Sequence, residues 1–269
     1  MNNHLYAKSR HLLLLMLLLF VVAGCQINDY DPDPNFEYRE NFLYARAVSG
    51  RSEVFITNVN GTITVLGIDT LSEVQISGTK IVKDQSEDAA TRHMSDITID
   101  VKESPSAFTI KTLQPNTSGG RTYEVDYEIL VPSTWRTTVT NVNGDVVIHN
   151  IRNTVTSSVV NGTVNATDIS GNTTITVTNG SINGKVNLPE NGTCALTLVN
   201  GNVTLLVPST LSASVSATVA LGTVSISGLP IAYTTNERTS VVGIVGGGKG
   251  TVRLSSVNGT VRLLGLLQY

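Results

Sequence analysis

The nine residues "TNVNGTITV" at positions 57–65 recur as "TNVNGDVVI" at 140–148, and "SVNGTVRLL" at 256–264 repeats their core. An Asn-Gly pair occurs in every copy, and Leu221-Gly222 is a variant of it. The glycines at 144, 162, 180, 201 and 222 are separated by 18, 18, 21 and 21 residues. A nearly fixed period of this length indicates stacked supersecondary units, because each unit then repeats the same set of contacts with its neighbour.

Apolar residues alternate strictly after each pair. Ile63 and Val65, Val203 and Leu205, and Val261 and Leu263 are separated by Thr64, Thr204 and Arg262. A period of two predicts a half-buried strand with one face inward and one outward.

Two architectures use such a unit. Asn-Gly is the strongest short-range signal for a hairpin, which favours an antiparallel meander. A meander needs a second strong turn midway, whereas "NTVTSSVV" and "NTTITVT" run directly into the next Asn-Gly. The spacing therefore predicts an all-β fold, a single-stranded parallel β-helix of right-handed sense, with coils of 18–21 residues stacked about 4.8 Å apart.

In this β-helix each Asn-Gly is a corner. We expect the asparagines to form an amide ladder from coil to coil, while glycine supplies the left-handed backbone, and Leu221 interrupts the ladder at one coil. The predicted turn ladder comprises Asn60, Gly61, Asn143, Gly144, Asn161, Gly162, Asn179, Gly180, Asn200, Gly201, Asn258 and Gly259.

The predicted β-helix domain covers residues 42–269. Residues 139–228 hold the regular repeats and 241–265 the C-terminal coils, whereas 67–138 lack the glycine repeat. Alternating stretches in that segment predict irregular early coils, with a short exposed helix inside 83–96.

The N-terminus carries a processing signal. Lys8 and Arg10 precede the apolar run "LLLLMLLLFVV", and the closing "VAGC" resembles a bacterial lipobox. We expect residues 1–24 to be a signal peptide, Cys25 to be lipidated, and 25–41 to be a tether. Gln26 rather than Asp after the cysteine favours the outer membrane.

Composition excludes several functions. Without Lys8 and Arg10 the mature 245 residues hold 16 basic and 21 acidic side chains, a net charge of −5. That balance, with no basic patch, argues against nucleic acid. Once Cys25 is lipidated, Cys194 has no partner, so we expect a buried thiol and no intramolecular disulfide.

Residues that could carry chemistry are sparse. "GIVGGGKG" at 243–250 resembles a phosphate-binding loop but has Gly250 where Ser or Thr belongs. His93 and His149 lack neighbours at ligand spacing, so no metal site or cofactor is expected. The charged residues between 141 and 235 are scattered, which predicts a non-catalytic protein. Trp135 is either a cap over an open coil end or a sugar platform.

Outward polar positions after the corners predict stacked rows of hydroxyls and amides. Such rows suit a repeating ligand such as a polysaccharide or ice, although β-branched polar residues are also the ordinary choice for solvent-facing strands. The possible ligand face comprises Thr62, Thr64, Thr163, Asn165, Ser181, Asn183, Asn202, Thr204, Thr223 and Ser225. Asp145, Val147 and Arg262 interrupt it.

The repeated "NVNG" units, the strand ends "ILVPST" (129–134) and "LLVPST" (205–210), and "GGGKGTVRLSSVNGTVRLLG" (246–265) resemble the bacterial putative-adhesin family of β-strand-repeat lipoproteins. The resemblance covers residues 42–265. It implies a parallel β-helix and a domain of unknown function, without an established site.

These observations predict a lipid-anchored protein of the bacterial cell envelope that contacts the membrane through its lipid and has an adhesion or surface-interaction role, with a glycan or protein ligand. Two alternatives stay open. One is a periplasmic structural or envelope-signalling module that binds another protein, and the other is a polysaccharide-binding or -cleaving β-helix protein.

Overall fold

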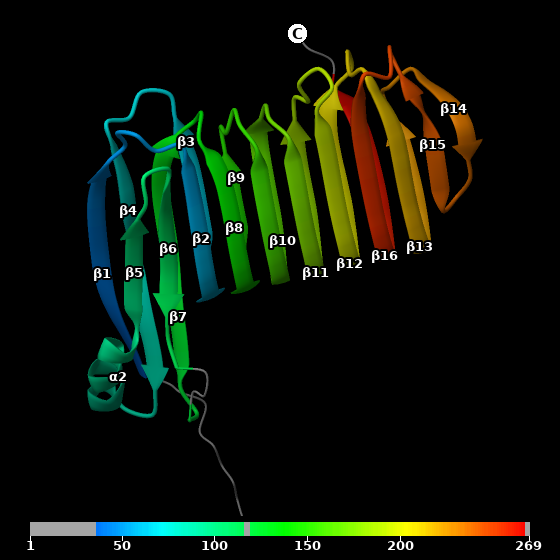
Figure 1. Cartoon of the computed structure of the whole chain (residues 1–269). Coiled ribbons are helices and arrows are strands. Elements are labelled where there is room, and N and C mark those ends of the chain that lie inside the picture. Colours follow the sequence, from blue (N-terminus) through cyan, green and yellow to red (C-terminus); the bar gives the residue numbers. More distant parts are fainter. Residues whose placement is uncertain (1–35, 116–118, 267–269) are drawn as a thin grey trace, which may run out of the picture. The chain divides into compact units, whose positions relative to one another are not determined.

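The computed structural model describes residues 36–115 and 119–266. The predicted signal peptide, Cys25 and most of the predicted tether lie outside these residues. The described chain is almost entirely β-structure (Figure 1). The strands are β1 (Phe36–Ala47), β2 (Glu53–Asn60), β3 (Ile63–Ile68), β4 (Glu73–Asp84), β5 (Thr98–Glu103), β6 (Ala107–Leu113), β7 (Thr122–Pro132), β8 (Arg136–Asn143), β9 (Val146–His149), β10 (Val155–Ile169), β11 (Thr173–Val186), β12 (Thr193–Pro208), β13 (Ala213–Ser227), β14 (Ile231–Asn236), β15 (Ser240–Val245) and β16 (Gly250–Leu266).

The strands hydrogen-bond into one large sheet in the order β1-β4-β7-β3-β9-β10-β11-β12-β16-β13-β15-β14. Strands β6, β2 and β8 join it through the first part of β10. Pairing is parallel from β3 and β2 through to β13, and antiparallel at both ends. The all-β class and a mostly parallel sheet are therefore confirmed.

Each repeat bends at its Asn-Gly pair, and the bends line up along the lower edge in Figure 1. In β10 and β11, Val159 pairs with Val177 before the bend and Val164 pairs with Ile182 after it, both at an offset of 18 residues. We call the segment before each bend the first half and the segment after it the second half. Alternate side chains of both halves are buried and form one hydrophobic core between them.

The change of period from 18 to 21 residues arises away from the bends. Only residues 170–172 connect β10 to β11, whereas residues 187–192 connect β11 to β12. Three extra residues enter a loop and leave the strand register unchanged, since Asn179 still pairs with Asn200. The loops along the upper edge thus absorb the length variation (Figure 1).

The spatial order of the repeats differs from their order in the sequence. Strand β16 lies between β12 and β13, so Asn258 is paired with Asn200 on one side and with Leu221 on the other. After β13 the chain forms the antiparallel hairpin β14–β15 and returns to insert β16. The prediction that Leu221 interrupts the amide ladder is wrong, because Leu221 stands at the end of the column.

Residues 67–138 also differ from the predicted irregular coils. Strand β4 pairs antiparallel with β1 and β7, and β5 pairs antiparallel with β6. Strand β1 begins at Phe36, inside the predicted tether, because residues 36–41 pair with β4. The expected helix is present as α2 (Glu87–His93), followed by the 3₁₀ turn η1 (Met94–Asp96). Ser86 caps α2 by accepting a hydrogen bond from the Ala89 amide at 3.2 Å.

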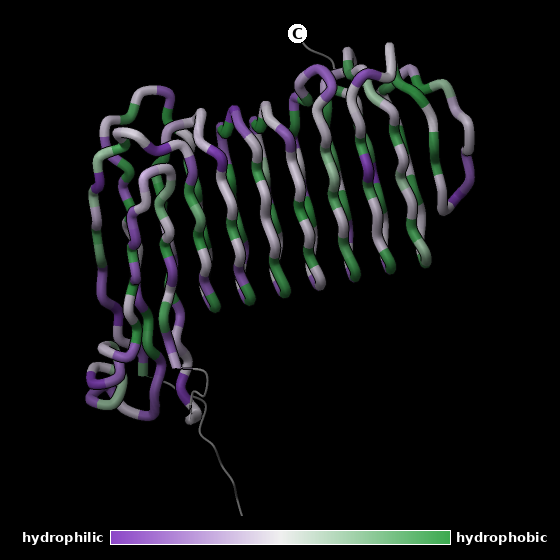
Figure 2. Tube along the Cα trace, in the orientation of Figure 1, coloured by the Kyte–Doolittle hydropathy of each residue, from purple (hydrophilic) through white to green (hydrophobic). Residues whose placement is uncertain are grey.

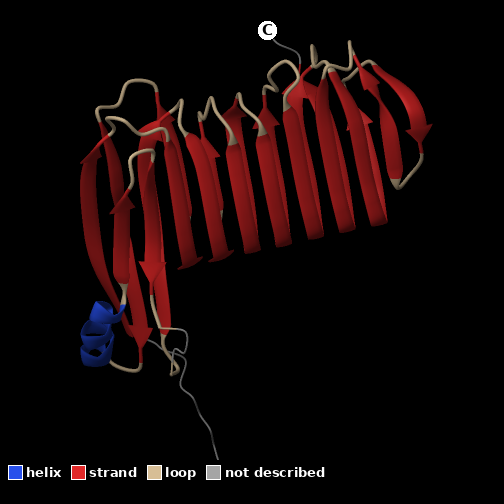
Figure 3. Ribbon diagram, in the orientation of Figure 1, coloured by secondary structure: helices blue, strands red, loops and turns tan. Residues whose placement is uncertain are grey.

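Figure 2 shows how the alternation of side chains appears along the strands, with hydrophobic and hydrophilic positions following one another on each repeat. Figure 3 shows the single helical segment at the end of the sheet that carries β1 and β4. At that end Trp135 is buried and stacks on Phe108, with ring centroids 5.9 Å apart. Trp135 therefore closes the core and is not an exposed sugar platform.

Corner glycines are expected to be irreplaceable. Gly201 has φ of 131°, and a Cβ atom there would lie 1.7 Å from the carbonyl oxygen of Gly180. We expect Gly201→Ala to lower the free energy of unfolding by at least about 2 kcal/mol, since both strain and a backbone clash result. Chemical denaturation measures this. Gly247→Ala is the control, because its Cβ would approach only side-chain atoms, the Ser212 hydroxyl at 3.3 Å and Lys249 Cγ at 4.0 Å. Equal effects of the two changes would contradict the assignment.

Cys194 is buried in the first half of β12, and burial raises the pKa of its thiol to about 12. In a chain carrying Cys25→Ser, we expect iodoacetamide at about pH 8 to modify Cys194 only after unfolding, because the thiolate is the nucleophile. Because the folded pKa lies above the unfolded value of about 8.5, this thiol leaves the free energy of unfolding unchanged below about pH 8.5 and lowers it as the pH rises from there toward 12. Mass spectrometry measures the modification, and rapid labelling of the folded chain would contradict the expectation.

Candidate functional site

The Asn-Gly corners form a continuous column of amide side chains. Each asparagine donates from Nδ2 to Oδ1 of the asparagine before it in the column, in the order Asn60, Asn143, Asn161, Asn179, Asn200 and Asn258. The five distances lie between 2.7 and 2.9 Å. Asn60 ends the column by donating to the Tyr123 carbonyl oxygen at 2.8 Å.

Backbone groups reinforce the same column. The Gly61 amide donates to the Asn143 carbonyl at 3.0 Å, and the Gly144 amide donates to the Asn161 carbonyl at 2.9 Å. Within the column, the side-chain amide of each internal asparagine thus already donates to one neighbour and accepts from the other. This occupation suits a structural role for the ladder better than ligand binding.

The register brings the predicted ligand residues together on the outer face of the second halves. Asn165 pairs with Asn183, Asn183 with Thr204, and Thr223 with Thr260 of β16. Some of their polar groups already have partners. The amide and hydroxyl of Thr62 both donate to Asp126 at 2.8 Å, and Asn183 donates to Asn165 at 2.9 Å.

Charged side chains also occupy the second-half face. The Thr163 amide donates to the Asp145 carboxylate at 2.7 Å, and Lys185 Nζ lies 2.7 Å from Asp168 Oδ1. His149 Nδ1 lies 3.0 Å from the Thr167 hydroxyl and 3.5 Å from Asp168. The hydrogen bond from Lys185 lowers the pKa of the Asp168 carboxyl. This face is therefore a mixture of ion pairs and occupied amides.

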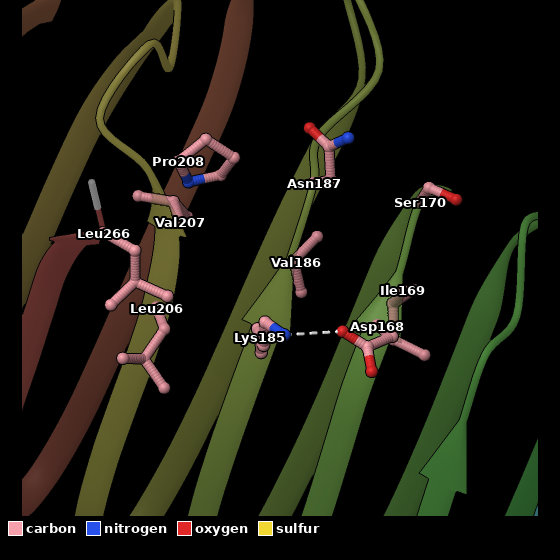
Figure 4. Close-up of a pocket in the computed structure, with 10 residues that line it drawn as sticks. All are labelled: Asp168, Ile169, Ser170, Lys185, Val186, Asn187, Leu206, Val207, Pro208 and Leu266. Atoms are coloured by element: carbon pink, nitrogen blue, oxygen red, sulfur yellow. Dashed lines mark hydrogen bonds and ion pairs between the residues drawn. The ribbon is translucent and has the colours of Figure 1, made fainter. Parts of the chain in front are cut away.

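A pocket of about 490 Å³ opens near the upper end of the second-half face. Figure 4 shows the Asp168–Lys185 pair on one side of it, and Leu206, Pro208 and Leu266 on the other. The pocket offers one ion pair beside an apolar wall, an arrangement that holds a small amphipathic group. It lies at the upper ends of β10, β11, β12 and β16.

The outer face of the first halves was missed by the sequence reasoning. The register aligns one hydroxyl side chain from each of seven neighbouring strands, a set that we call the hydroxyl row: Thr57, Thr140, Ser158, Thr176, Thr197, Ser255 and Thr218. The residues that precede the corner asparagines form the next row, which we call the valine ridge: Val59, Val142, Val160, Thr178, Val199, Val257 and Ala220, the last preceding Leu221. The valine that precedes most of the Asn-Gly pairs could have revealed this row in the sequence.

The valine ridge is solvent-exposed. Val142, Val160, Val199 and Val257 have exposed fractions between 36% and 46%. Figure 2 shows hydrophobic colour at the lower ends of the strands, beside the corners. Solvent-facing strand positions are usually polar, so a line of exposed valines marks this edge as a contact surface.

Other classes of site find little support among residues 36–115 and 119–266. No group of three or more His, Cys, Asp or Glu side chains there is placed to hold a metal ion. None of the helices in these segments has the length and apolar character needed to cross a membrane. The 243–250 segment passes from β15 through a turn into strand β16, where a phosphate-binding loop would lead into a helix.

Comparison with known proteins gives a likeness in fold. No protein-family model matches the chain, and no curated protein matches it in sequence. Among solved structures, it is similar to a putative cell adhesion protein from Clostridium sporogenes ATCC 15579, with 11% identity and a TM-score of 0.52 over 85% of this chain and 100% of that chain. A putative adhesin from Bacteroides fragilis NCTC 9343 has 10% identity and a TM-score of 0.33, over 83% of this chain and 97% of that chain. The second TM-score is too low to define a shared fold. The expected resemblance to putative adhesins is thus confirmed at the level of fold.

The amide ladder predicts that replacing one of its asparagines lowers the stability of the fold. Asn200 donates to Asn179 and accepts from Asn258, so Asn200→Ala removes two side-chain hydrogen bonds. We expect the free energy of unfolding to fall by about 1–2 kcal/mol, measured by urea denaturation. Asn202→Ala is the matched control in the same strand. Asn202 is exposed and makes no side-chain hydrogen bond in the described structure, so its loss should cost less than about 0.5 kcal/mol.

Proposed function

We propose that this chain is a lipid-anchored, non-catalytic adhesion protein of the bacterial cell envelope, and that its repeats wind as a short parallel β-helix. The observation that carries the proposal is the repetition of outward side chains from strand to strand at one register. A surface of this kind presents the same contact many times, which favours attachment to extended or repetitive partners through many weak contacts.

Three further features support it. The "VAGC" sequence is typical of lipidated envelope proteins, and residues 26–35 separate its cysteine from the first strand, β1. The fold is like that of a protein described as a putative cell adhesion protein. The carboxylates Asp145, Asp168 and Glu190 each bind a different local partner, which favours binding over acid–base catalysis.

Location on the cell tests the proposal. Full-length protein expressed in a bacterium with two membranes should partition with the outer membrane, and Cys25→Ser should release it to a soluble fraction. Protease added to intact cells should digest the wild-type chain, because an adhesion protein must face outward. Digestion only after the outer membrane is permeabilised would exclude adhesion to external ligands. That outcome would favour a periplasmic module that binds another envelope protein.

A further inference from the structure

The two outer faces of the repeats differ in charge. On the second-half face, the Thr62 hydroxyl donates to the Asp126 carboxylate, the Thr163 backbone amide donates to the Asp145 carboxylate, and Lys185 pairs with Asp168. In the hydroxyl row, the described structure has one side-chain hydrogen bond, from Ser255 to Thr197 at 3.3 Å. The outward hydroxyls of the other five residues have no hydrogen-bond partner in the described structure and are available to a ligand.

The hydroxyl row and the valine ridge together form a long uncharged strip. Neither row contains a charged residue across its seven strands. Neighbouring strands lie about 4.8 Å apart, so the strip extends for roughly 29 Å. The charged side chains on the same face lie outside the strip. They include Lys111 beside Thr57, Arg253 beside Ala195, and the Glu53–Arg136 pair at the start of β2 and β8.

The chemistry of the strip narrows the class of ligand. An anionic or cationic polymer gains affinity from opposite charges, and the strip supplies none. A neutral sugar chain instead presents hydroxyl edges that can pair with the hydroxyl row and C–H faces that can pack on the valine methyl groups.

The regular spacing of the strip narrows the class of ligand further. Because the hydroxyl and methyl groups recur at each strand, only a partner that is itself repetitive can make the same contact along the whole strip. Each contact is weak, and a linear polymer adds them together. A globular protein partner lacks that repeat.

We propose that the strip formed by the hydroxyl row and the valine ridge binds an uncharged, linear polysaccharide lying across the strands. The inference rests on the proposed adhesion function and names its ligand class. The ligand would lie on the outer face of the first halves, whereas the ligand residues predicted from the sequence lie on the outer face of the second halves.

Sedimentation with purified polysaccharides tests the inference. The full chain, carrying Cys25→Ser, is mixed with microcrystalline cellulose, insoluble mannan and insoluble xylan, and with insoluble polygalacturonate as a polyanion. We expect the chain to sediment with at least one neutral polymer and to remain bound in about 1 M NaCl, where charge interactions are screened. Sedimentation with none of the neutral polymers, or only with the polyanion in low salt, would overturn the inference.

Two variants of one strand locate the site. Thr197→Arg places a long charged side chain in the middle of the strip, whereas Asn202→Arg places the same side chain on the opposite face of β12. We expect Thr197→Arg to weaken binding at least about tenfold and Asn202→Arg to leave it unchanged. Urea denaturation checks that both variants fold. Equal binding by the two folded variants would overturn the placement. The assay uses purified protein, so its failure is distinguishable from a failure of the cell-surface location.

Discussion

The close approach of one backbone to the next at the Asn-Gly corners is the constraint on which the rest of the structure depends. A Cβ atom on Gly144, Gly162, Gly180 or Gly201 would lie between 1.7 and 2.3 Å from the carbonyl oxygen of the glycine in the neighbouring repeat. Only glycine fits that distance with a positive φ. Superposed corners in turn hold the first and second halves of every repeat in register, which places the alternate apolar side chains of both halves in one core.

The asparagine before each glycine depends on the same close stacking of the corners, because its side chain bonds to the asparagine of the next repeat. An amide has both a donor and an acceptor, so identical amides stacked at strand spacing satisfy one another without any other residue type. Leu221 lacks both groups. Its place at the end of the column is consistent with this chemistry, since Asn258 in the inserted strand β16 continues the ladder from Asn200 and Leu221 follows it.

The two ends of the parallel region are closed differently. On the side of β2 and β3, antiparallel strands and a short helix cover the core with large side chains, including Phe108, Tyr127 and Trp135. Tyr127 is deeply buried there and its hydroxyl lies 2.7 Å from the Thr112 hydroxyl. On the side of β13, the hairpin β14–β15 pairs with the first half of that strand. Strand β7 thus covers the edge of β3, and β15 covers Ala213–Thr218 of β13, which shortens the open sheet edges at the ends of the stack.

Much of the local structure follows from the sequence alone. The Asn-Gly spacing and the period-two alternation predicted strands after every corner, and Val146, Ile148, Val203 and Leu205 are fully buried as the alternation requires. These features depend on near neighbours in the chain, because turn conformation and strand alternation are local properties. The polar stretch 83–96 predicted a short exposed helix, and the structure has α2 there, beginning after the capping residue Ser86.

Only the tertiary structure decided the order of the repeats and the character of the two faces. The insertion of β16 between β12 and β13 is a long-range pairing at an offset of 58 residues from β12, and no local pattern records which edge a returning strand will join. The hydroxyl row is likewise invisible in the sequence, because Thr62 and Thr176 are both exposed threonines within three residues of a corner asparagine. They differ in that Thr62 lies beside Asp126 of a distant strand, and that contact exists only once the chain has folded.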